Sequence, residues 1–145
     1  MLNLKNARKP AQIKQMIELK KQGICPFCQK HLSKTHANPV EMNGEYWVVT
    51  KNDYPYNGTK IHYLLIHKKH ISKISQISPK ASIELIRLIK KICRKHSVLG
   101  ETLVMRSGDT SYTGASIEHL HAHVISGAKQ NKKAEILTTT IGWKR

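Results

Sequence analysis

Three histidines alternate with apolar residues in the segment His119-Leu120-His121-Ala122-His123-Val124-Ile125. Side chains of a β-strand point alternately to its two faces, so a strand here places all three histidines on one face. The apolar residues between them share the other face, where a core would bury them. The chain must therefore fold around a strand that is buried on one side and carries a cluster of titratable groups on the other, which is typical of a functional site.

The length and the charge narrow the class of protein. The 145 residues fit one domain, and 39% of them are apolar. No apolar run approaches the roughly 18 residues of a membrane span, and we expect no secretory signal, so a membrane protein, a secreted precursor, a collagen or a coiled coil is excluded. Three cysteines argue against a disulfide framework and favour a cytoplasmic protein. The net charge of +16 attracts polyanions, whether nucleotides, nucleic acid or acidic membranes.

Hydrophobic periodicity predicts an α+β fold with a largely antiparallel sheet. Helical patterns follow Pro10, ending at Gly23, and Ser78, ending at Gly100, and Asn43-Gly44 is a hairpin turn signal. The expected strands are 46–50, 61–66, 102–105 and 118–125. We predict one domain over 1–145, with an amino-terminal helix in 1–22 and a basic carboxyl-terminal extension over 127–145. In the longer helix the apolar stripe is expected to contain Ile83, Leu85, Ile86, Ile89, Ile92 and Cys93.

Cys25-Pro26-Phe27-Cys28 is a Cys-x-x-Cys motif. Such a pair is half of a zinc site or a redox pair, and the thioredoxin-like order of elements that a redox pair requires is absent. A closed zinc site needs two more ligands. Cys93 is a poor candidate because it lies on the apolar stripe, and a reduced dithiol without metal stays open as the alternative.

The histidine run resembles the His-φ-His-φ-His-φ-φ signature of the histidine-triad (HIT) nucleotide-binding family, where φ is apolar. The resemblance extends from about Cys25 to Gly127, with gaps. Residues 114–117 are similar to the family's phosphate-contacting turn, 62–71 to its second motif, and 52–57 to the loop that holds the ribose. The resemblance implies a HIT-like fold with one long helix, to which the amino-terminal helix is an addition.

The resemblance also implies the chemistry. His121 would attack the α-phosphate of a nucleotide and form a nucleotidyl-histidine, which water or another acceptor resolves. His123 would hydrogen-bond the phosphate or the leaving group, and Ser116 would help to protonate the leaving group. A neutral imidazole is in any case a competent nucleophile toward an activated phosphoryl group.

Five further positions are candidates for binding the nucleotide. Asn52 and the adjacent Asp53 resemble ribose-binding positions, while His62 matches a position near the nucleotide. Leu64 is a candidate wall for the base, although burial statistics favour a core role. Arg106 lies near a phosphate-side position. His67 stands where the family usually has proline, and we expect its side chain to be exposed.

The chain resembles the zinc-bearing branch of the family. By that resemblance a structural zinc is held by Cys25, Cys28, His70 and His119, and the protein forms a homodimer. Two cysteines and two histidines would close a tetrahedral site. The zinc would fix His119 and thereby orient the strand that carries His121.

Three functions remain open. The first is a hydrolase or nucleotidyl transferase for a small nucleotide, of the dinucleoside polyphosphate or nucleoside phosphoramidate type. The second is a HIT-like protein that binds or processes DNA or RNA ends through its basic surface. The third is a zinc-stabilised nucleotide binder without activity. Aromatic residues make up 6% of the chain, which is few for a platform that stacks bases, so we favour the first.

Overall fold

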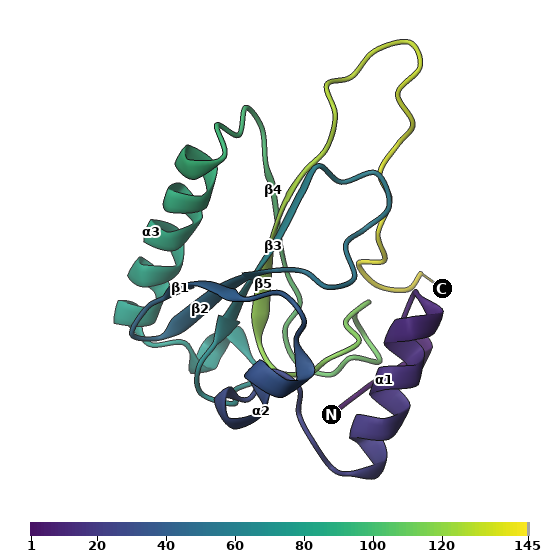
Figure 1. Ribbon diagram of the computed structural model, residues 1–145, viewed down its shortest axis with the longest axis vertical. Coiled ribbons are helices and arrows are strands. Elements are labelled where there is room, and N and C mark those ends of the chain that lie inside the picture. Colours follow the sequence, from purple (N-terminus) through teal and green to yellow (C-terminus); the bar gives the residue numbers. More distant parts are fainter. Residues whose placement is uncertain (145) are drawn as a thin grey trace.

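The structure is a computed structural model and describes residues 1–144 (Figure 1). Five strands form one sheet in the order β1-β2-β3-β5-β4, and every neighbouring pair is antiparallel. This confirms the α+β prediction. Within the described residues, no helix combines the length and apolar character of a membrane span. The elements are the helices α1 (Pro10–Lys21), α2 (Gln29–Thr35) and α3 (Pro79–Lys95), two short 3-10 turns (Leu4–Asn6 and Ile74–Gln76), and the strands β1 (Val40–Asn43), β2 (Trp47–Lys51), β3 (Ile61–His67), β4 (Thr102–Met105) and β5 (His121–Ser126).

Four elements differ from the sequence prediction. Strand β1 is absent from the expected strands, although the Asn43-Gly44 turn signal lies at its end, and β5 begins at His121 instead of at residue 118. Helix α2 was not predicted, because its seven residues contain one buried apolar side chain, Leu32, and therefore carry no periodic signal. Helix α3 ends at Lys95, short of Gly100, and Ser97 adopts a positive φ of 48° just beyond its end. The single-domain assignment stays a prediction.

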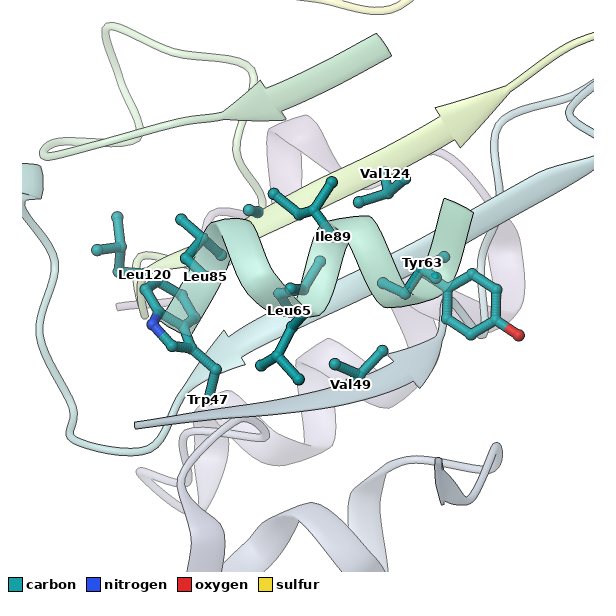
Figure 2. Close-up of a cluster of buried hydrophobic side chains, with 11 residues drawn as sticks. Trp47, Val49, Tyr63, Leu65, Leu85, Ile89, Leu120 and Val124 are labelled. Carbon is teal, nitrogen blue, oxygen red and sulfur yellow. The ribbon is translucent and has the colours of Figure 1, made fainter. Parts of the chain in front are cut away.

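Helix α3 covers one face of the sheet and forms the main core with it (Figure 2). The apolar positions of β5 and its approach face this helix, as the alternating pattern predicts. Leu120 and Val124 are completely buried there, beside Leu65 of β3. The buried members of this core are Trp47, Val49, Tyr63, Leu65, Leu85, Leu88, Ile89, Ile92, Leu120, Ala122 and Val124.

The buried side of α3 is narrower than its apolar stripe. Ile83 and Ile86 were expected on that stripe, but they are 71% and 53% exposed. The helix instead buries Ala81, Glu84 and Leu88, which lie three and four residues apart along one face. The predicted stripe was therefore too wide on one side and missed Leu88, while its members Leu85, Ile89 and Ile92 are buried.

The other face of the sheet carries a smaller apolar layer. Val48, Leu64 and Ile66 pack there against Phe27 and Leu32. Helix α1 lies on this side, away from α3 (Figure 1), and its Met16 and Leu19 pack against Leu2 and Ile117. Both amino-terminal helices therefore border the face that carries the histidines.

The buried carboxylate of Glu84 ties α3 to the β1–β2 turn. It accepts hydrogen bonds from the backbone N–H groups of Glu45, Tyr46 and Trp47 at 2.7–3.0 Å. A Cβ at Gly44 would lie 2.7 Å from the same carboxylate, so the turn requires glycine for this close approach. The Asn43-Gly44 turn is thus held by Glu84, a residue of α3 that lies 40 positions after Gly44 in the sequence.

We expect Glu84→Gln to lower the free energy of unfolding at neutral pH by about 1–3 kcal/mol, because buried N–H donors lose a charged acceptor. Burial alone would raise the pKa of Glu84, but the backbone donors and Arg87 outweigh it and hold the pKa below the ordinary 4.5. A lowered pKa stabilises the fold above the unfolded-state pKa, and this contribution disappears as the pH falls through the folded-state pKa. Denaturant unfolding at neutral and stepwise lower pH measures both effects.

The matched control is Glu18→Gln, which removes an exposed carboxylate that pairs with Lys21. The control should change stability by well under about 1 kcal/mol. Equal losses in the two variants, or a Glu84→Gln deficit that does not shrink in acid, would show that the carboxylate does not stabilise the turn.

Candidate functional site

The three histidines lie on the sheet face opposite α3. In the β3–β5 pairing, His121 is opposite Ile66 and His123 is opposite Leu64. His119 precedes the first residue of β5, and all three side chains are at most 7% exposed. The alternating sequence therefore places three buried imidazole rings on one face of the sheet.

His121 has a defined tautomer. Its Nδ1 lies 2.7 Å from the carbonyl oxygen of His119. A carbonyl only accepts, so Nδ1 carries the proton and Nε2 keeps an unshared electron pair. Burial lowers the pKa of His121 to about 4, so the ring is neutral at physiological pH. Phe27 packs edge-on against it, with ring centroids 4.9 Å apart.

A chain of hydrogen bonds determines the tautomer of His123. The backbone N–H of Tyr56 donates to Nδ1 of His62 at 3.1 Å, so the proton of the neutral His62 ring is on Nε2. That N–H donates to Nδ1 of His123 at 2.8 Å, which leaves His123 with its own proton on Nε2. Burial lowers the pKa of His62 to about 3 and that of His123 well below its ordinary value. Both rings are neutral, and His62 holds the His123 ring in place through the hydrogen bond between them.

A cavity of about 60 Å³ opens beside His121 and His123. Leu64 and Ser116 line it, so Leu64 both bounds the cavity and belongs to the apolar layer on this face. Helix α1 forms another wall, and Nε2 of Gln12 donates to the Ser116 hydroxyl at 3.3 Å. This volume is smaller than the several hundred Å³ of typical ligand pockets, so α1 partly closes the site.

The two ribose candidates differ in how fully they are engaged. Both carboxylate oxygens of Asp53 accept hydrogen bonds from the backbone and side chain of residues 37–38, and His36 lies 3.0 Å away. Oδ1 of Asn52 accepts one bond from the Tyr54 N–H, and its Nδ2 lies 3.0 Å from Nε2 of His62, whose proton is directed to His123. Asp53 therefore holds a neighbouring loop, while Asn52 keeps an unused donor and acceptor capacity.

The Arg106 guanidinium does not line the histidine cavity. It donates to the hydroxyl of Tyr56 at 3.0 Å and to the hydroxyl of Thr139 at 2.9 Å, and also to the Thr140 carbonyl. The carboxyl-terminal extension thus returns to the site after its excursion beyond β5 (Figure 1). Its backbone at Thr140 lies so close to Gly114 that a Cβ there would overlap it.

A second cluster lies at the other end of the histidine row. Sγ of Cys28 is 3.1 Å from Nδ1 of His70 and 3.8 Å from Nδ1 of His119, which is also 3.5 Å from Sγ of Cys25. The four atoms lie within 4.8 Å of one another. Bonds of 2.0–2.3 Å to a tetrahedral zinc place ligand atoms about 3.3–3.8 Å apart, so this donor set fits the metal with small adjustments.

The tautomer of His119 also fits a metal. Its Nε2 lies 2.6 Å from the His67 carbonyl oxygen and must donate to it, so Nδ1 faces the sulfurs with its electron pair free. The expectation that His67 is exposed was wrong: it is 4% exposed and packs edge-on against Trp47 at 4.9 Å. Strand β3 runs through residue 67, which keeps that side chain over the core.

Several site residues were not identified from the sequence. Arg8 and Gln12 belong to the amino-terminal segment, Phe27 lies between the two cysteines, and Tyr56 packs against His62 and His123. Residues of common types that lie outside a motif give no indication in the sequence that they belong to a site. Pro55, Asn57 and Gly58 indicate a loop around Tyr56, but they do not indicate that its side chain is buried.

The family model of the HIT domain matches residues 45–130 of the sequence. Among solved structures, a HIT family hydrolase from Clostridium thermocellum is 23% identical and has a TM-score of 0.60, with 75% of this chain and 95% of that chain covered. A zinc-bound histidine triad family protein from Mycobacterium smegmatis is 19% identical, with a TM-score of 0.57 and coverage of 76% and 79%.

A hypothetical histidine triad nucleotide-binding protein from Sulfolobus tokodaii is 21% identical, with a TM-score of 0.57 and coverage of 83% and 82%. At these identities the likeness is one of fold. The search of curated proteins found no match.

Proposed function

Because the chain belongs to the histidine-triad (HIT) family, we propose that it is a hydrolase or nucleotidyl transferase that attacks the α-phosphate of a small nucleotide. The supporting observation is the tautomer of His121, whose Nε2 electron pair is free beside a neutral His123. Substrates of the dinucleoside polyphosphate or nucleoside phosphoramidate type fit this chemistry, since both carry a leaving group on the α-phosphorus.

The first step would form a bond from Nε2 of His121 to phosphorus. The bond from phosphorus to the leaving group breaks, and its electron pair goes to the leaving atom. A phosphate leaving group departs as an anion, whereas an amine takes a proton that Ser116 passes from water. The positive charge on the substituted His121 ring is stabilised by the His119 carbonyl, which already accepts its Nδ1–H.

The second step would release the nucleotide. Water, or another acceptor, attacks phosphorus, and the electron pair of the nitrogen–phosphorus bond returns to His121. The products are a nucleoside monophosphate and a proton when water is the acceptor. His123 keeps its own proton throughout and donates a hydrogen bond through Nε2–H to phosphate oxygen. In this proposal Asn52 binds the ribose, and Leu64 forms part of the wall around the base.

We expect His121→Ala to lower turnover of the best nucleotide by about 1,000-fold or more, since no other group can replace the covalent step. Nucleotide binding should survive. The measurement is product analysis by chromatography over a panel of nucleotides, with direct binding of the same nucleotides by calorimetry. His31→Ala is the control, because His31 lies on α2 outside the cavity. Near-normal turnover by His121→Ala, purified identically, would refute the assignment.

We also propose a structural zinc at Cys25, Cys28, His70 and His119. When bound, zinc would cross-link the segment before α2 to the residues at the start of β5. With four protein ligands it has no open position for substrate. The support is the fit of the four ligand atoms and the tautomer that His119 adopts.

Elemental analysis should give one zinc per chain, and chelation should lower the melting temperature by about 10 °C or more because the metal contributes to folding. Cys28→Ser should lose the zinc. Cys93→Ser is the matched control, since Cys93 is a free cysteine outside the cluster, and it should keep the metal. A wild-type preparation that never met chelator and contains no zinc would contradict this proposal.

A nucleic-acid function is the second candidate, and helix α3 favours it. The exposed side of this helix carries its basic side chains. Arg87, Lys91 and Arg94 follow one another at helical spacing. The exposed basic residues of the helix are Lys80, Arg87, Lys90, Lys91, Arg94 and Lys95.

We nevertheless expect weak duplex binding, since two of these cations are paired, Arg87 with Glu84 and Lys95 with Glu41. The test is a salt titration of binding to short DNA and RNA duplexes, using His121→Ala to prevent turnover. A log–log slope steeper than about −4.5, which corresponds to five phosphate contacts, together with micromolar affinity, would make nucleic acid the leading function. Lys90→Glu with Lys91→Glu should then abolish binding, while Lys129→Glu with Lys132→Glu on the extension should not.

The homodimer implied by the family resemblance and the cytoplasmic location favoured by the cysteine content also remain proposals. Ile83 and Ile86 on α3 and Leu103 on the edge strand β4 are exposed apolar side chains that a second copy would cover. Light scattering that gives the mass of one chain at high protein concentration would exclude the dimer. The free state of Cys25, Cys28 and Cys93 suits a reducing compartment, which localisation of the tagged protein would test.

A further inference from the structure

Two arginines meet at the ring of Tyr56, next to the histidine row. The guanidinium carbon of Arg8 lies 4.0 Å from the centroid of this ring, and Nη2 donates to the Tyr54 carbonyl at 2.9 Å. Arg106 donates to the Tyr56 hydroxyl at 3.0 Å. The same ring stacks on His123, with an interplanar angle of 18° and centroids 5.8 Å apart. Both guanidinium groups therefore contact Tyr56, and the ring of Tyr56 in turn packs against His123.

Neither guanidinium has a carboxylate partner within residues 1–144. Asp53 borders the cavity but is engaged by the loop at residues 36–38. Burial lowers the pKa of Arg8, and the nearby charge of Arg106 lowers it further. Two adjacent cations without a counter-ion repel each other, and an anion bound between them would relieve that repulsion.

Arg8 lies at the junction of two cavities. It lines the small cavity that contains His121 and His123, and it also lines a second cavity of about 710 Å³. The second cavity lies between the turn at Tyr56 and the carboxyl-terminal extension, and Lys9 contributes another cation. Glu135 is the acidic residue of this lining and is exposed. The space suits an extended anionic group that continues from the α-phosphate.

We propose that Arg8 binds the anionic leaving group of the substrate and thereby selects nucleotides that release a phosphate-containing group over those that release a neutral amine. This inference rests on the proposed attack by His121 and adds a residue from outside the matched HIT domain. In this arrangement the three groups follow the order of the substrate: the nucleophile His121 at the α-phosphorus, the donor His123 at the adjacent oxygen, and the cation Arg8 at the next phosphate.

Arg8 acts in the step in which the phosphorus–oxygen bond breaks. The electron pair of that bond passes to the leaving oxygen, so the leaving phosphate gains one negative charge as His121 becomes bonded to phosphorus. A guanidinium stabilises this charge through paired N–H donors. Arg106 positions the Tyr56 ring on which Arg8 stacks. Lysine at position 8 would keep the charge but lose both the stacking and the paired donors.

The kinetic test uses two substrates that share the adenosine 5′-phosphoryl group, a diadenosine polyphosphate and adenosine 5′-phosphoramidate. We expect Arg8→Gln to reduce kcat/KM for the polyphosphate by about 10- to 100-fold, which corresponds to the loss of a charged hydrogen bond. The phosphoramidate should change by less than about 3-fold, and Arg8→Lys should fall between. Lys5→Gln removes an exposed charge from the same segment and should leave both rates unchanged.

A binding measurement separates this proposal from the proposed activity. Inorganic tripolyphosphate is titrated into His121→Ala and into His121→Ala with Arg8→Gln, with calorimetric readout. We expect at least a 10-fold loss of affinity from the second substitution. If the wild type turns over neither nucleotide, the proposed activity fails, but this titration still decides the role of Arg8. Equal kinetic losses for both substrates, or equal affinity for tripolyphosphate, would overturn the proposal.

Discussion

His119 ties three parts of the molecule together, and the geometry of the site depends on it. Its Nε2–H donates to the His67 carbonyl at the end of β3, and its Nδ1 faces the sulfurs of Cys25 and Cys28. Its own carbonyl accepts the Nδ1–H of His121. One completely buried residue therefore fixes the segment before α2 and the tautomer of its neighbour. A displacement of the β3 end or of the cysteines would reach His121 through this connection.

The electrostatics of the site resolve an apparent conflict between the proposed function and the charge of the protein. A histidine nucleophile must be neutral, and burial is the largest cause that lowers the pKa of His121 and of His123. The positive charge of Arg106 acts in the same direction. A chain with a net charge of +16 can thus attract an anionic substrate over long range without protonating the groups that meet it.

The part of the site that the sequence predicts is the part that depends on local periodicity. Alternation placed the histidines opposite the core, and the helical and strand patterns predicted the α+β sheet. Contacts between residues far apart in the sequence were not predictable in this way. Asn3 donates to the Ser116 carbonyl, and Gln12 to its hydroxyl, across more than 100 positions. Neither residue has a neighbour in the sequence that would indicate such a partner.

The difference between local patterns and long-range contacts also explains individual errors in the sequence prediction. His67 was expected to be exposed, but β3 continues through it and turns its ring toward Trp47. Ile83 and Ile86 satisfy an apolar pattern, yet the side of α3 that faces the sheet is the one that carries Leu88 and the buried carboxylate of Glu84. The contact between Gly114 and Thr140 restricts the sequence changes that this protein can accept during evolution. The turn and the extension occupy adjoining space, so substitutions at one are constrained by the backbone path of the other. Insertions and deletions should accumulate in the exposed residues 128–135, whereas the spacing around residues 139–143 should stay fixed in any descendant that keeps this arrangement.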